Sequence, residues 1–175
     1  MLRSEKGFTI VELLIVVVVI AILAAITIVA YNGFTNRTHD TTVQSDLGAL
    51  GKKIQMFRTQ SATNTYPANL ADMNTLDFKA SKGSYAITPA VAVNIGYCVN
   101  AAGDTFAVFA MSKSGNRYVV RDNGTVSADT TGVTWNASTA TLSSLCTVYG
   151  TGAVTHAYVQ SDTTTGPWRA WGGGN

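Results

Sequence analysis

Residues 8–31 read FTIVELLIVVVVIAILAAITIVAY, and this stretch decides the fold because its 24 residues carry a single charged side chain, Glu12. An α-helix rises about 1.5 Å per residue, so about 20 apolar residues cross the hydrocarbon core of a bilayer. The stretch is therefore long enough to span a membrane as a helix. Arg3 and Lys6 precede it, which favours a cytoplasmic N-terminus with the chain after about residue 32 outside.

An N-terminal apolar run is also typical of a secretory signal peptide or a plain signal anchor. Two features oppose that interpretation: the run exceeds the usual core of about 7 to 15 residues, and it contains the carboxylate of Glu12. A carboxylate inside a membrane costs about 2 to 3 kcal/mol on insertion scales and is generally functional or paired.

Glu12 therefore needs a partner. The apolar run contains no Lys, Arg or His, so the nearest cation would be a new amino terminus made by cutting the chain just before Phe8. Phe8 and Glu12 are four residues apart, about one helical turn, so the amine and the carboxylate can face each other within one chain or between neighbouring chains.

The run KGFTIVELLI, from Lys6 to Ile15, resembles the leader and cleavage site of type IV pilins and their pseudopilin relatives. The resemblance covers about the first 30 residues. It implies that a prepilin peptidase cuts between Gly7 and Phe8 and methylates the new amine of Phe8. It also implies that Glu12 meets the amine of an adjacent subunit during assembly. One departure is that many family members carry a Pro in the second half of the apolar segment, where this chain has none.

The segment after the apolar run has a helical pattern with one apolar face. Its apolar positions step by four and three residues, which places them along one stripe of a helix: Val43, Leu47, Leu50, Ile54 and Phe57. We therefore expect one helix from Phe8 to about Gln60 whose second half packs on a globular head. The run GALGKK at residues 48–53 lacks the spacing of a phosphate-binding loop, and we interpret it as a solvated helix face.

Beyond residue 61 the pattern changes to short runs with strand character, separated by turn residues. We expect a loop with one short helix around Leu70, Met73 and Leu76, followed by an antiparallel meander. The predicted strands are Ser84–Thr88, Val93–Val99, Thr105–Met111 and Tyr118–Arg121, with residues 153–159 as a candidate extra strand.

The fold class expected is therefore α+β: a long N-terminal helix packed on an antiparallel sheet. One face of the sheet should carry Phe106, Val108 and Ala110 beside Tyr118 and Val120, and a sheet with an apolar face needs a cover, which the helix stripe provides. The predicted divisions are a leader (1–7), a transmembrane or filament-core helix (8–31), an amphipathic half-helix (32–60) and a β-rich head with a C-terminal tail (61–175).

Cys98 and Cys146 lie in the part of the chain expected outside the cell. Thiols in an oxidising compartment usually pair, and closing so long a loop constrains the unfolded chain by about 4 kcal/mol. We therefore expect a disulfide, with two buried thiols or a metal site as the alternatives. His39 and His156 have no neighbours at ligand spacing, so we expect neither a metal nor another cofactor.

Trp168, Arg169 and Trp171 close to the C-terminus have two interpretations. Exposed aromatic side chains beside Arg are typical of surfaces that bind a partner or ligand. The alternative, which we favour, is that these side chains pack against an edge of the sheet.

The function classes can be narrowed in the same way. Only 13% of the 175 residues are charged and the net charge is +2, which is unlike a nucleic-acid-binding domain. No nucleophile motif accompanies either His, so we do not expect an enzyme. We expect a structural subunit, held in the cytoplasmic membrane as a precursor and then polymerised by a pilus assembly machinery into an extracellular helical filament.

Such a filament would serve adhesion, twitching motility or DNA uptake, with the surface or DNA ligand unknown. One alternative is a minor pilin or a type II secretion pseudopilin. A third class is a surface binding protein held by a signal anchor that never polymerises.

Overall fold

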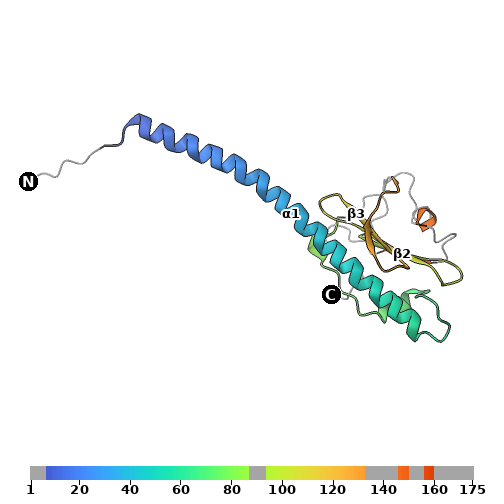
Figure 1. The fold of residues 1–175 in the computed structure, drawn as a ribbon. Helices are drawn as coiled ribbons and strands as arrows, with labels where there is room; N and C mark the ends of the chain where they lie inside the picture. The colour runs from blue at the N-terminus through green and yellow to red at the C-terminus, as the bar shows by residue number, and fades with distance from the viewer. Residues whose placement is uncertain (1–6, 87–93, 133–145, 150–155, 160–175) are drawn as a thin grey trace, which may run out of the picture. The chain divides into compact units, whose positions relative to one another are not determined.

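The computed structural model describes residues 7–86, 94–132, 146–149 and 156–159 (Figure 1). The chain divides into two compact units, Met1–Arg37 and Thr38–Asn175, and the long helix contributes to both. The elements along the chain are α1 (Ile10–Gln60), α2 (Leu70–Asn74), the short 3-10 helix η1 (Lys82–Ser84), β1 (Ile95–Val99), β2 (Phe106–Met111), β3 (Arg117–Arg121), β4 (Val126–Ala128) and β5 (His156–Val159). The expected α+β class is confirmed.

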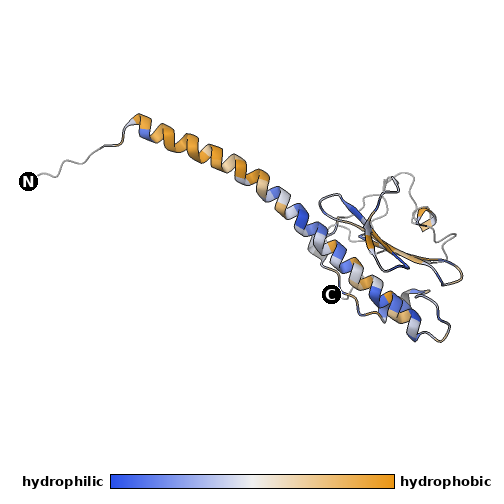
Figure 2. Cartoon of the chain, in the orientation of Figure 1, coloured by the Kyte–Doolittle hydropathy of each residue, from blue (hydrophilic) through white to orange (hydrophobic). Residues whose placement is uncertain are grey.

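The first unit contains the N-terminal part of α1, which is mostly apolar from Ile10 to Ala30, with Glu12 as its one charged residue (Figure 2). Its large apolar side chains are exposed, among them Ile15, Ile22 and Val29. Among the described residues, α1 is the one helix long and apolar enough to cross a bilayer by length and composition. A helix that exposes apolar side chains on every side needs lipid or other helices around it.

The second unit buries the predicted stripe of the helix. Val43, Leu47, Leu50 and Ile54 are fully buried and Phe57 is partly buried against the same core, which confirms the stripe. The apolar face of the sheet that meets it is also the expected one: Phe106, Val108, Ala110, Tyr118 and Val120.

The interpretation of residues 48–53 as a solvated face was wrong for Gly51, which is buried. Leu50 in the same run is buried, as the stripe predicts. A Cβ atom at Gly51 would lie 3.0 Å from Cγ2 of Val120, so the missing side chain lets the helix approach the sheet closely. Lys52 is exposed, whereas Lys53 is half-buried and its Nζ donates hydrogen bonds to the carbonyl oxygens of Leu76 and Asp77 at 2.8 and 2.9 Å.

The sheet is antiparallel, with the strand order β4-β3-β2-β1-β5. Strands β1 and β2 lie within two of the predicted runs, and β3 matches a third except that it begins one residue earlier, at Arg117. Strand β5 lies within the candidate run 153–159, and α2 is the short helix expected around Leu70. The prediction of a strand at Ser84–Thr88 was wrong for residues 84–86, because Ser84 ends η1 and Tyr85 forms only an isolated bridge with Ser112. Residues 87 and 88 lie outside the described part of the chain. Strand β4 was not predicted, because its three residues are too few to show an alternating pattern.

The sheet has a second apolar face, opposite the helix. Side chains alternate between the faces along each strand, so Cys98, Ala107, Phe109 and Val119 lie on the face away from the helix-facing core. Cys146 and Tyr149, from the turn at residues 146–149, complete this separate cluster. Gly96 pairs with Phe109 across β1 and β2, and a Cβ at Gly96 would lie 2.2 Å from Cζ of Phe109. The Phe109 ring therefore occupies the space that a side chain at position 96 would fill.

We predict opposite effects for the same substitution at two glycines. Gly96→Ala should lower the free energy of unfolding by about 1–3 kcal/mol, because the Phe109 ring must move within a packed cluster. Gly48→Ala should raise it by about 0.5–1 kcal/mol, because its Cβ would meet Cγ2 of Val126 at an ordinary 3.6 Å and Ala favours a helix. Urea unfolding of the full chain in detergent micelles measures both; equal stability of the two variants would contradict the packing described.

Polar side chains of α1 fasten the loops of the head to the helix. Asp46 accepts hydrogen bonds from the Ser81 N–H at 2.7 Å and from the Tyr85 hydroxyl at 3.0 Å. Asp40 accepts hydrogen bonds from the Ser114 hydroxyl and, at 2.8 Å, from Nδ2 of Asn116. These two carboxylates therefore hold the loop before β1 and the turn between β2 and β3.

Gln55 and Arg58 fasten the far end of the same helix. Nε2 of Gln55 donates to the carbonyl oxygen of Asp122 at 2.8 Å. Nε of Arg58 donates to the carbonyl oxygen of Asn64 at 3.0 Å, and its guanidinium lies 4.8 Å from the centre of the Tyr66 ring.

These contacts shift the titration of the groups involved. Burial and the neighbouring Asp46 carboxylate raise the pKa of Tyr85. Partial burial acts to raise the pKa of Asp40, but the hydrogen bonds from Ser114 and Asn116 outweigh it and leave that pKa below its ordinary value.

We predict that Asp40→Asn reduces the loss of unfolding free energy that occurs as the pH falls below about 4. A depressed folded-state pKa means that Asp40 stabilises the head above about pH 4, the ordinary pKa of Asp, and that this contribution is lost as the pH falls through the folded value. The effect should not exceed about 1 kcal/mol, because the carboxylate is partly exposed to solvent. Urea unfolding between pH 6 and pH 2 tests it.

The matched control is Asp77→Asn, since the Asp77 carboxylate is exposed and accepts no hydrogen bond from any described residue. A wild-type pH profile for Asp40→Asn, or an equal reduction of this loss in both variants, would show that Asp40 has no such role.

Candidate assembly site at the helix N-terminus

The bond predicted to be cut, between Gly7 and Phe8, lies outside the helix. Residues 7–9 have no regular secondary structure, and α1 begins at Ile10. Phe8 is 88% exposed, and a Cβ at Gly7 would meet nothing within 4 Å. The bond is therefore in an accessible segment outside the helix. Residues 1–6 of the predicted leader lie outside the described residues.

The helix starts two residues later than expected because Thr9 caps it. The Glu12 N–H donates to Oγ1 of Thr9 at 3.2 Å. In return, Oε2 of Glu12 accepts hydrogen bonds from the Thr9 N–H at 2.9 Å and the Thr9 hydroxyl at 2.8 Å. This reciprocal pattern is a capping box, for which the signature is Thr or Ser followed three residues later by Glu. The signature T-x-x-E is present at residues 9–12, and the reasoning from sequence missed it.

The capping box changes the account of Glu12. The sequence suggested that only a new amino terminus could serve as its partner, whereas the structure supplies a nearer one in the same chain. Hydrogen bonds to Thr9 and the positive end of the helix dipole both stabilise the carboxylate and reduce the cost of placing it in an apolar segment.

One oxygen of this carboxylate is still available. Both hydrogen bonds from Thr9 go to Oε2, and Oε1 accepts none from any residue that the structure describes. The two donors of the cap belong to Thr9, so they would remain after a cut between Gly7 and Phe8. The carboxylate can therefore keep its cap and accept a charge-assisted hydrogen bond from an ammonium group through Oε1.

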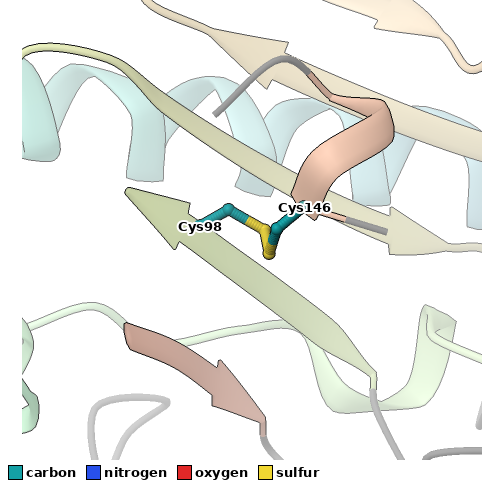
Figure 3. Close-up of a disulfide and its surroundings, with 2 residues drawn as sticks. All are labelled: Cys98 and Cys146. Atoms are coloured by element: carbon teal, nitrogen blue, oxygen red, sulfur yellow. A yellow bond between two sulfur atoms is a disulfide. The ribbon is translucent and has the colours of Figure 1, made fainter. Parts of the chain in front are cut away.

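The expected disulfide is present in the structure. It joins Cys98 on β1 to Cys146, at a Cα–Cα distance of 5.5 Å (Figure 3). Both cysteines are fully buried, within the cluster on the face of the sheet opposite the helix. Two buried free thiols and a cysteine metal site are thus both excluded.

The two histidines singled out from the sequence lie on different elements of the described part of the chain. Nδ1 of His39 lies 3.3 Å from Oγ of Ser84, a contact between α1 and η1, and His156 is on β5. Within the described ranges, no three His, Cys, Asp or Glu side chains gather as metal ligands. Trp168, Arg169 and Trp171 lie outside the described residues, so both interpretations of them stay open.

Comparisons with known proteins agree with the site at the N-terminus. Residues 2–28 match a family model described as the prokaryotic N-terminal methylation motif. The chain is 34% identical to the type IV wide pilus major component PilA4 of Thermus thermophilus over 98 residues, which are 56% of this chain and 73% of that protein. No solved structure matches the chain.

Two further relatives match over shorter stretches of the chain. A fimbrial protein of Pseudomonas aeruginosa is 49% identical over 49 residues, which are 28% of this chain and 32% of the relative. The type IV major alpha-pilin of Moraxella bovis is 42% identical over 48 residues, which are 27% of this chain and 30% of the relative. Together with the helix and sheet described above, these similarities show that the chain belongs to the type IV pilins.

We predict that Thr9→Ala loosens the first turn of α1. Loss of a hydroxyl cap costs about 1 kcal/mol, so the Glu12 amide should exchange its hydrogen roughly fivefold faster. The measurement is hydrogen exchange by NMR on the uncleaved chain in detergent micelles. The control is Thr27→Ala, because the Thr27 hydroxyl only donates to the Ala24 carbonyl oxygen at 3.0 Å and caps no helix end. Unchanged exchange in Thr9→Ala would show that the capping box does not hold the turn.

Proposed function

We propose that this chain is a filament-forming subunit of a type IV pilus, made as a precursor and cut between Gly7 and Phe8 by a prepilin peptidase that also methylates the new amine. The observation that carries the proposal is a combination of three features at the N-terminus. The Gly7–Phe8 bond is exposed and lies outside the helix, the Glu12 carboxylate follows one turn later, and the apolar side chains of the helix are exposed on its surface. The relatives that are named as pilus or fimbrial components support it.

The precursor is proposed to sit in the cytoplasmic membrane with its N-terminus inside and its head outside. The positive residues before the apolar run favour this orientation, and an apolar helix of this length suits the bilayer core. In this proposal, residues 1–7 are the leader, residues 8–31 pass from lipid into the filament core, residues 32–60 form the half of the helix that carries the head, and residues 61–175 make up that head with its tail.

Assembly needs an interaction that lipid cannot offer. Moving an apolar helix from lipid into a bundle of like helices gains little from the hydrophobic effect, because lipid tails are as apolar as Leu or Val. An ion pair in the same apolar surroundings is strong, since the effective dielectric constant is low. We therefore assign the register of the filament to Oε1 of Glu12 and the amine of the partner's Phe8.

In this proposal the chain has a structural role and no catalytic one, and the filament serves adhesion, motility or DNA uptake outside the cell. The names of the relatives, which describe major components and fimbrial proteins, favour the main subunit over a minor pilin or a secretion pseudopilin. Abundance of the chain in purified filaments separates these alternatives.

We predict that Glu12→Ala leaves processing intact and reduces the filament yield at least about tenfold, because the partner amine then lies unpaired in an apolar core. The matched control is Glu5→Ala, the same substitution in the leader, which cleavage removes. Mass spectrometry of the mature chain should find N-methylated Phe8 at the terminus in both variants, and electron microscopy gives the filament yield.

A normal filament yield for Glu12→Ala would contradict the ion pair. A chain that keeps Met1, or that loses the whole apolar run, would instead contradict the proposed processing and indicate a signal-anchored or secreted protein.

A further inference from the structure

The face of the sheet that points away from α1 is closed by a short segment of chain. Residues 146–149 form a single helical turn, and both Cys146 and Tyr149 are buried there against Phe109 and Val119. The disulfide attaches one end of this turn to β1. The other end, at Tyr149, is attached to different strands without a covalent bond.

The ring of Tyr149 is held by two neighbours on β2 and β3. Its centre lies 4.9 Å from that of Phe109, with the ring planes tilted by 32°. The guanidinium of Arg121, on β3, lies 5.7 Å from the centre of the Tyr149 ring, within the range of a cation–π contact. Only 3% of Tyr149 is exposed, so the ring is a packed anchor and not a surface residue.

The hydroxyl of Tyr149 donates a hydrogen bond to Oδ2 of Asp129 at 3.0 Å. The side chain of Asp129 is fully buried, and Nε of Arg117 lies 3.8 Å from the same oxygen. Oδ1 accepts from the Thr131 N–H at 3.0 Å and from its hydroxyl at 2.6 Å. Burial acts to raise the pKa of Asp129, but the hydrogen bonds from Thr131 and Tyr149 and the charge of Arg117 lower it overall. Both oxygens of the buried carboxylate therefore have partners, and the Tyr149 hydroxyl supplies the hydrogen bond to Oδ2.

We propose that Tyr149 and Asp129 form a non-covalent latch that keeps residues 146–149 docked on this face of the sheet independently of the Cys98–Cys146 disulfide. The two attachments use different strands, since the disulfide holds β1 and the latch holds β2, β3 and the residue that follows β4. A hydrogen bond to a buried charge is also among the stronger ones in proteins. The latch therefore holds Cys146 beside Cys98 when the sulfur–sulfur bond is open. This inference does not depend on the filament role.

The experiment measures how fast the two thiols react after the disulfide is reduced. The full chain in detergent micelles is reduced with a phosphine at pH 8, and iodoacetamide labelling of Cys98 and Cys146 is followed by mass spectrometry. The labelling rate of each thiol is divided by its rate in the same variant unfolded in concentrated urea. This normalisation corrects for the intrinsic reactivity of the thiol. The latch predicts that the reduced wild-type chain is labelled at least about a hundredfold more slowly than the urea-unfolded chain.

Tyr149→Phe removes only the hydroxyl and keeps the ring. It should raise the normalised labelling rate about tenfold. The matched control is Tyr85→Phe, in which the lost hydroxyl also donates to a carboxylate, that of Asp46, at 3.0 Å, but on the helix side of the sheet. This control should leave the labelling rate within about twofold of wild type. Circular dichroism of each variant with its disulfide intact shows that it folds.

Asp129→Asn is a second test of the same latch. It keeps the shape of the side chain but turns one acceptor into a donor, so it should speed labelling at least as much as Tyr149→Phe. The proposal is overturned if the reduced wild-type chain reacts as fast as the unfolded chain. It is also overturned if neither latch variant reacts faster than wild type, or if Tyr85→Phe accelerates labelling equally.

Discussion

The head of this pilin depends on the contact between one stripe of α1 and one face of the sheet. Val43, Leu47, Leu50 and Ile54 are removed from water entirely, and burying side chains of this size contributes about 1.5–3 kcal/mol each. Gly51 lets the helix come close enough for that packing. Because the helix covers only one face, the strands must bury their other face differently, and the disulfide-linked turn at residues 146–149 does so.

Hydrophobic periodicity predicted the parts of the fold in which the same spacing of apolar residues continues over many residues. The apolar run and the stripe from Val43 to Phe57 repeat over several turns, and β1, β2 and β3 are flanked by turn residues. Residues 84–86 were mistaken for a strand because Tyr85 is a buried aromatic residue. Its hydroxyl donates a hydrogen bond to Asp46 of α1, so it belongs to the contact with the helix. The second apolar cluster was also missed. Its members Ala107, Phe109 and Val119 alternate along the strands with residues already assigned to the helix-facing core.

The residues of the candidate site were proposed from the sequence, whereas their geometry was not foreseen. The order of Gly7, Phe8 and Glu12 along the chain was sufficient to identify the family, and the comparisons agree. The hydrogen bonds from Thr9 to Glu12 depend on a helix start that hydropathy alone does not locate, because Phe8 and Ile10 are equally apolar. The disulfide could be expected because both cysteines lie in the part of the chain predicted to be in an oxidising compartment. The contact between Tyr149 and Asp129 could not, because no sequence pattern connects two residues 20 positions apart.

The polar attachments of the head to α1 have a mechanical consequence. Asp40, Asp46, Lys53, Gln55 and Arg58 all bind loops of the head, and they are spread over about 27 Å of helix at 1.5 Å per residue. A force along the helix axis therefore strains all five attachments at once, together with the stripe beneath them, instead of breaking them one after another. A head fastened in this way resists shear better than the modest strength of any single surface hydrogen bond suggests.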